Sequence, residues 1–224
     1  WKEDMLADIT EPSAPFNLKS GHLNGQRISE TRRPLETALA QRLRAQARRL
    51  GVSVSSLCHL SWGRVLSAAC GSDSVVFGTV LSGRMHGENS DKIMGPCINT
   101  LPLRLDMDGR SVEASVRQAH ARLSGLLAHE HASLALAQRC SGVKSGAPLF
   151  SALLNYRHND GEALALPEGV SLIGADERTN YPFVLSVDDG MDSLALTAQV
   201  IDPIEASRVC RYMQQALTAL VNAL

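Results

Sequence analysis

The stretch from Ser74 to Arg104 is the part of the sequence that constrains the fold most strongly. Residues 75–81 form a nearly unbroken apolar run with β-branched side chains, which is typical of a strand buried on both faces. Ser82-Gly83-Arg84 follows directly, and a small residue beside a glycine predicts a turn. We therefore expect a buried strand that ends in a turn from which one cation emerges.

A second strand is predicted on the far side of a short polar loop. Gly95 and Pro96 punctuate the return of the chain, and residues 98–105 again have strand character, with Asn99 and Thr100 near the entry. A guanidinium, a carboxamide and two hydroxyls would then lie at the end of a buried sheet, where ligands often bind in α/β proteins. The pattern alone also fits two strands and a tight turn that carry ordinary surface polar groups.

Length and charge limit the classes of protein that this chain can represent. Its 224 residues fit one large domain or one lobe of a larger one. A net charge of −1 gives no electrostatic reason to expect nucleic acid or an anionic membrane as a partner. No apolar run approaches the roughly 20 residues that span a bilayer. The first residues lack the apolar core of a signal peptide and do not start with methionine, so we expect a cytoplasmic piece of a longer gene product.

The cysteines indicate neither a disulfide framework nor a metal site. They are odd in number and scattered, and no pair has the spacing of metal ligands. We interpret them as small hydrophobic residues in a reducing compartment. The five are Cys58, Cys70, Cys97, Cys140 and Cys210.

Periodicity and capping residues predict alternating helices and strands after a polar, proline- and glycine-broken segment over 1–33. Residues 183–188 and 194–200 alternate about a turn and predict a hairpin. The expected helices are 34–50, 54–69 with Ser53 as cap, 111–128, 133–140 and 202–221, and the further expected strands are 149–156 and 170–173.

Two histidine-containing segments suggest chemistry without the residues to complete it. His129-Glu130-His131 could bind a metal, but no third ligand is in view, and the pattern favours a charge effect at a helix end over a metal site. The tetrapeptide from His158 to Gly161 reads as a turn. None of the seven histidines has an aspartate four residues later.

Four motifs, in order, resemble those of the condensation domains of nonribosomal peptide synthetases, members of the chloramphenicol-acetyltransferase-like superfamily. The segment 93–104 is similar to the family's glycine-x-x-x-asparagine-threonine motif. The segment 77–84 is similar to its glycine-threonine strand ending in serine-glycine-arginine. His129–Leu134 and Ala147–Ser151 stand where two later motifs fall. The resemblance covers the whole chain but only the second half of such a domain.

The resemblance implies a mixed β-sheet flanked by helices, which is the C-terminal lobe of that fold. Residues 1–33 would connect from a missing N-terminal lobe, and 34–224 would form the C-terminal lobe. A tunnel between the lobes would admit phosphopantetheine arms from peptidyl carrier domains, with a neighbouring adenylation domain, and no cofactor would bind this chain directly. By resemblance, Asn99, Ser82, Arg84, Thr100 and Gly95 lie along that tunnel.

The resemblance also implies an activity and its alternatives. Condensation domains form amide bonds between carrier-bound aminoacyl or peptidyl thioesters, and the family's histidine–aspartate motif lies in the half that this sequence does not contain. No catalytic residue is therefore expected here, and the lobe should be inactive alone. A noncatalytic lobe that docks carrier proteins, or half of an epimerisation domain, remains an alternative. The segment 130–143 and residues 178–182 resemble the subgroup that handles D-configured donors.

Overall fold

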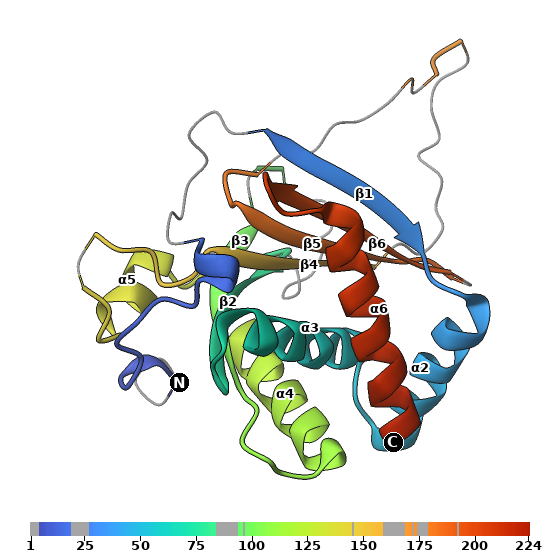
Figure 1. Ribbon diagram of the computed structural model, residues 1–224, viewed down its shortest axis with the longest axis horizontal. Coiled ribbons are helices and arrows are strands. Elements are labelled where there is room, and N and C mark those ends of the chain that lie inside the picture. Colours follow the sequence, from blue (N-terminus) through green and yellow to red (C-terminus); the bar gives the residue numbers. More distant parts are fainter. Residues whose placement is uncertain are drawn as a thin grey trace.

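The structure, a computed structural model, describes residues 5–18, 27–83, 94–95, 97–144, 146–158, 169–171, 173, 179–191 and 193–224. In this part of the chain one mixed sheet is flanked by helices (Figure 1), as the sequence predicts. The strands are β1 (Ile28–Pro34), β2 (Ser74–Leu81), β3 (Asn99–Asp106), β4 (Ala152–His158), β5 (Phe183–Asp189) and β6 (Leu194–Ile201).

The strand order across the sheet is β1-β6-β5-β4-β2-β3. β5 and β6 form the predicted antiparallel hairpin, with Phe183 opposite Val200. β2 and β3 form a second antiparallel pair, with Leu81 opposite Asn99. β4 is parallel to both of its neighbours. The sheet thus joins two antiparallel units through a parallel centre.

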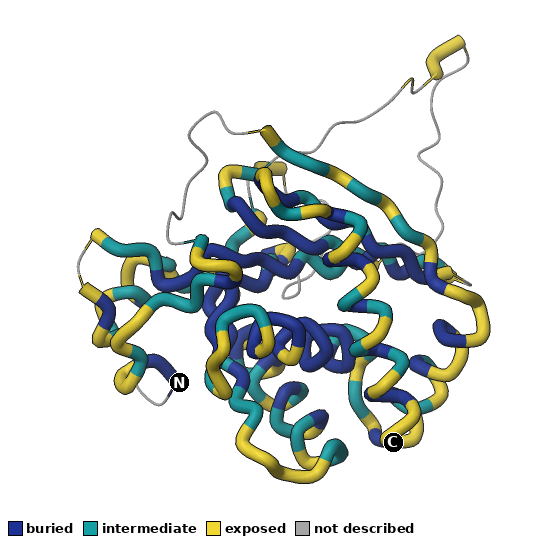
Figure 2. Tube along the Cα trace, in the orientation of Figure 1, coloured by how far each residue is buried: buried dark blue, intermediate teal, exposed yellow. Residues whose placement is uncertain are grey.

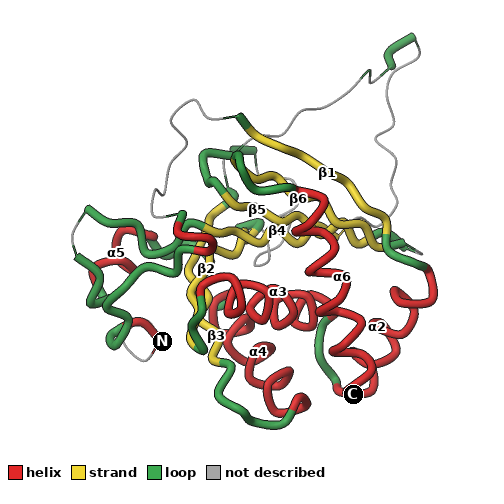
Figure 3. Tube along the Cα trace, in the orientation of Figure 1, coloured by secondary structure: helices red, strands yellow, loops and turns green. Residues whose placement is uncertain are grey.

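Four longer helices lie on one side of this sheet, as Figure 3 shows. α3 is the central one and contacts β2, α4 and α6, so that it is buried almost all around rather than along a single stripe. The shorter α5 lies beside β3. The helices are α2 (Thr37–Leu50), α3 (Val54–Cys70), α4 (Val112–Leu127), α5 (Leu134–Arg139) and α6 (Ala206–Ala223), and a single 3₁₀ turn, η1, covers Pro15–Asn17.

Local signals set the ends of the two helices nearest the site. The Ser53 hydroxyl accepts a hydrogen bond from the Ser56 amide at 3.1 Å, which caps α3. Gly71 ends the same helix in the left-handed conformation. The Ser111 hydroxyl caps α4 by accepting from the Ala114 amide at 3.3 Å. These caps confirm the predicted starts of both helices.

The main hydrophobic core lies between the sheet and the helices, where Figure 2 shows the buried trace. Trp62 of α3 stacks on Phe183 of β5, with ring centroids 5.3 Å apart. A smaller cluster covers part of the opposite face, where Val76, Leu153 and Val184 pack against the N-terminal segment and α5. The rest of that face, toward β1 and β6, carries polar side chains.

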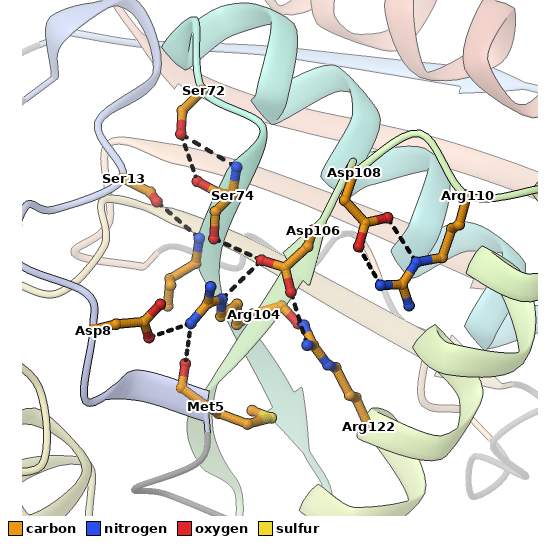
Figure 4. A network of polar contacts seen from close by, with 11 residues as sticks. Met5, Asp8, Ser13, Ser72, Ser74, Arg104, Asp106, Asp108, Arg110 and Arg122 are labelled. Atoms are coloured by element: carbon orange, nitrogen blue, oxygen red, sulfur yellow. Dashed lines mark hydrogen bonds and ion pairs between the residues drawn. The ribbon is translucent and has the colours of Figure 1, made fainter.

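A polar network ties the N-terminal segment to β3, the edge strand of the sheet (Figure 4). Arg104 donates to the Met5 carbonyl oxygen, pairs with Asp8, and lies 2.8 Å from an Asp106 oxygen. Asp106 also pairs with Arg122 of α4 at 2.8 Å. Burial alone would raise the pKa of Asp106, but these hydrogen bonds outweigh it and hold the pKa below its usual value.

Three sequence predictions about elements are wrong. Pro34 does not begin a helix: it ends β1, opposite Ala195, and α2 starts at Thr37. Proline is tolerated there because β1 is an edge strand. The last helix begins at Ala206 rather than at residue 202, after a cis peptide bond between Asp202 and Pro203. In the segment 170–173, the described residues form no strand.

The cysteines are all free, and Cys58 and Cys210 are fully buried while the other three are half-buried. Burial raises the pKa of the Cys58 thiol to about 12, so it stays protonated. Within the described ranges no helix combines the length and apolarity needed to cross a membrane.

Candidate functional site

The sheet splits between β2 and β4. These parallel strands pair at two positions, Gly78 with Leu153 and Thr79 with Leu154. Beyond them β2 continues to Leu81 without pairing to β4. By contrast, β4 and β5 stay paired along their whole length. The carboxyl ends of β2 and β4 are therefore separated at the middle of the sheet.

A cavity of about 1060 Å³ occupies this split. Successive residues of a strand point to opposite faces of a sheet, yet both Thr79 and Val80 of β2 line the cavity, as do Asn155 and Tyr156 of β4. The cavity therefore reaches both faces of the sheet through the gap between the two strands. Its volume is close to the upper end of the range of small-molecule sites, about 1,000 Å³.

We call the face of the sheet that lies away from the four longer helices the open face. On this face the cavity wall is mostly polar and partly charged. Arg157 donates to Asp188 at 2.7 Å, and Arg32 of β1 approaches the same carboxylate at 4.0 Å. Gln199 donates to Glu30 at 2.8 Å. The described open-face lining residues on β1, β4, β5 and β6 are Glu30, Arg32, Leu153, Asn155, Arg157, Val184, Ser186, Asp188, Thr197 and Gln199.

On the helix face, the wall centres on a buried histidine. Nε2 of His59 lies 2.7 Å from the Thr79 hydroxyl, and Nδ1 lies 2.7 Å from the Ser55 carbonyl oxygen. Burial lowers the pKa of His59 to about 4, so the ring is neutral at pH 7. The helix-face lining residues are Ser53, Ser55, His59, Thr79, Leu81, Leu123, Leu127, Tyr156 and His158.

At the carboxyl end of β4, His158 lies beside Asp189 of β5. His158 Nδ1 lies 3.2 Å from an Asp189 oxygen, and Tyr156 donates to the same carboxylate. Arg44 of α2 reaches the second oxygen at 2.7 Å. Asp189 is 3% exposed, so this cluster links α2, β4 and β5. Asp160, the aspartate of the predicted turn, lies outside the described residues.

Of the four predicted tunnel residues that the structure describes, two line the cavity. Ser82 and Thr100 are among its lining residues, at the end of β2 and the start of β3. Gly95 is exposed and has a φ of 134°. Arg84 falls outside the described residues.

Asn99 makes its contacts inside the fold. Its side-chain nitrogen donates to the carbonyl oxygens of Glu130 and Ala132 at 2.7 and 2.8 Å. Its side-chain oxygen accepts from the Thr100 amide at 2.9 Å. The carboxamide thereby fastens the start of β3 to the turn that connects α4 and α5, next to the lining residue Thr100.

The segment 129–131 forms that turn. Glu130 is buried, while His131 is exposed and its Nε2 lies 3.8 Å from a Glu130 oxygen. Among the described residues, no three histidine, cysteine, aspartate or glutamate side chains are grouped closely enough to hold a metal ion.

Sequence reasoning missed the helix-face wall. Ser55 and His59 stand one helical turn apart in a helix whose long side chains are mostly apolar, a spacing that could have marked a buried polar pair. Thr79 sits in an apolar strand run. No local sequence signal reveals that Thr79 contacts His59, because the contact forms only when α3 packs on β2.

Comparison with known proteins agrees with this architecture. A family model described as "Condensation domain" matches residues 8–223. The chain is 53% identical to malpibaldin synthetase and 52% identical to malpinin synthetase, both from Mortierella alpina, over 99% of its own length. It spans 4% and 3% of those two proteins.

Solved structures show the same fold at low identity. The first condensation domain of the CDA synthetase superposes with a TM-score of 0.73 at 18% identity, over 94% of this chain and 47% of that one. The condensation domain of the monacolin K polyketide synthase MokA gives 0.71 at 19%, over 98% and 50%. The chain belongs to the condensation-domain family, and both relatives quoted above are synthetases of Mortierella alpina.

Proposed function

We propose that this chain is the C-terminal half of a condensation domain that joins two carrier-bound acyl groups through an amide bond. The match of the family model to residues 8–223 carries the proposal. The coverage of about half of each solved condensation chain supports the assignment to one lobe.

The reaction needs an amine to attack the carbonyl carbon of a thioester. A C–N bond forms, the C–S bond breaks, a thiol leaves and the amine loses a proton. A base and donors that stabilise the tetrahedral oxyanion lower this barrier. The base would come from the N-terminal lobe, because no histidine in this chain carries the family's aspartate spacing. This chain would supply one wall of the reaction chamber.

The partners of the lobe follow from that role. The N-terminal lobe would close the cavity at the split in the sheet. Peptidyl carrier domains would deliver substrates on phosphopantetheine arms, an adenylation domain would neighbour the lobe, and the assembly would work in the cytoplasm. Neither nucleic acid nor a membrane is among the proposed partners.

Within the chamber, Ser82 and Thr100 would face the substrates, with Arg84 and Gly95 along the same channel. Asn99 would act as a positioning residue. It holds Thr100 and the α4–α5 turn by the three hydrogen bonds described above, and so would set the wall without touching the reacting atoms.

The test is a condensation assay on the complete domain with loaded donor and acceptor carriers, read by mass spectrometry of the carrier-bound product. The complete domain should form the amide, and the 224-residue chain alone should form none. Carrier binding without product would instead support a docking lobe, and inversion of the donor without a new amide bond would support an epimerisation domain.

A further inference from the structure

The part of the cavity behind the sheet differs in chemistry from the part in front of it. We call it the rear chamber and define it by Ser55, His59, Thr79, Leu123, Leu127 and Tyr156. The charged lining residues Glu30, Arg32, Arg157 and Asp188 belong to the open face. Among the described lining residues on the helix face, the second histidine besides His59 is His158. Its ring lies beside Asp189 at the end of β4.

The hydrogen bonds of the rear chamber fix the direction of its polar groups. The Ser55 carbonyl oxygen can only accept, so His59 Nδ1 carries the proton, and Nε2 accepts from the Thr79 hydroxyl. Because the Thr79 hydroxyl donates to His59, its oxygen keeps lone-pair capacity toward the cavity. The polar end of the chamber is therefore neutral and offers an acceptor.

The remaining walls are apolar. Leu123 is 7% exposed but belongs to neither of the two hydrophobic clusters. Leu127, one turn further along α4, is half-buried and packs at the margin of the main core. Both leucines line the cavity, so they present apolar surface to a space that protein side chains among the described residues do not fill.

We propose that the rear chamber is a specificity pocket for a neutral, mainly apolar side chain of one of the two acyl groups, which enters through the gap between β2 and β4. This proposal rests on the condensation activity proposed above. A charged side chain would lose its hydration in the chamber, and the six residues that define the chamber offer it no counter-ion; this costs far more than burying an apolar group of equal size. The two leucines would limit the size of the substrate side chain that the pocket accepts. The neutral polar groups beside them would disfavour a charged side chain.

The experiment fills the chamber and reads substrate choice in the complete domain. Leu127→Trp puts an indole into the space, while Ser124→Trp puts the same bulk on an exposed position of α4 that does not line the cavity. Donor and acceptor aminoacyl carriers are varied separately with alanine, leucine, glutamine and glutamate side chains. The series that responds identifies which substrate uses the pocket.

For one of the two series, Leu127→Trp should lower kcat/KM for leucine at least about tenfold more than for alanine, and Ser124→Trp should leave the ratio unchanged. Leu127→Ala, which enlarges the chamber, should shift preference toward larger side chains. The wild type should use glutamine at least about tenfold better than glutamate.

Equal losses for alanine and leucine in both series, with Leu127→Ala also leaving preference unchanged, would overturn the pocket. Equal use of glutamine and glutamate would overturn its neutrality. A wild-type domain that forms no amide from any pair would instead refute the proposed activity, so the two failures are distinguishable.

Discussion

Replacing Asn99 tests whether this residue acts as a scaffold in the fold. Asn99→Ala removes two hydrogen bonds to the carbonyl oxygens of Glu130 and Ala132 and one from the Thr100 amide. At about 1 kcal/mol for each bond, the free energy of unfolding should fall by about 3 kcal/mol. Turnover should fall with it, because the turn between α4 and α5 loses its attachment to β3.

The assay is urea denaturation of the complete domain beside its condensation rate. Asn222→Ala is the matched control, since Asn222 is an exposed asparagine that accepts one surface hydrogen bond from Arg42, and its loss should change stability little. Asn99→Asp should be worse than Asn99→Ala at pH 7, because a carboxylate would face two carbonyl oxygens.

The Asn99→Asp defect should also depend on pH in a defined direction. The two carbonyl oxygens favour the protonated acid, so the folded-state pKa of the new carboxyl would lie above its unfolded value of about 3.9. The defect should therefore fade as pH falls through the raised pKa. If Asn99→Ala keeps full stability while turnover drops about 100-fold, the carboxamide contacts substrate directly and the scaffold reasoning is wrong.

Three further outcomes test other parts of the fold. Gly83→Ala should destabilise more than Gly51→Ala: both glycines have a φ of 65°, but a Cβ at Gly83 would lie 1.9 Å from the Cys97 carbonyl oxygen, whereas Gly51 has nothing within 4 Å. Equal melting temperatures for the two variants would contradict this close approach. The stability advantage of the wild type over Asp106→Asn should be present at pH 7 and shrink as pH falls below about 4, because a lowered carboxyl pKa stabilises only above the unfolded value. A difference that stays constant across an acid titration would exclude the ion pairs as its source. His59 should lower the free energy of unfolding of the wild type by about 3 kcal/mol as pH falls from 6.5 to 4, because unfolded His59 gains a proton in this range and folded His59 does not. In urea titrations, His59→Gln should lack this decrease. Parallel pH profiles for the two proteins would argue against a neutral buried ring.

Local chemistry explains which elements the sequence predicts. Ser53 and Gly71 carry their own capping signals, and α3 begins and ends beside them. The alternation in 183–188 and 194–200 is likewise local and gives the hairpin. Pro34 misled because its strand exists only through pairing with β6, more than 160 residues away along the chain. A sequence window contains no trace of that partner.

The site residues also differ in whether a local sequence signal marks them or only the packing of distant elements places them. Ser82 and Thr100 line the cavity, and their place along a substrate tunnel, expected from the resemblance, stays a prediction. Helical spacing could mark His59 as a buried polar residue, but the place of His59 and Leu127 in the cavity wall could not be predicted, because it depends on how α3 and α4 pack against the sheet at the split between β2 and β4. Asn99 was expected along the tunnel, and the structure shows its side chain hydrogen-bonded to the backbone carbonyl oxygens of Glu130 and Ala132. A sequence motif identifies such a residue but does not give the contacts that its side chain makes.

The edges of the sheet bear on how such a chain is synthesised. β1 ends in Pro34, and β3, at the other edge, carries Pro102 in its middle. Proline lacks the amide hydrogen that a new strand would bond to. The matched region is 4% and 3% of the length of the two Mortierella alpina synthetases. Edges that resist strand addition would keep a newly synthesised sheet of this kind from exchanging strands with a neighbouring sheet before both have folded.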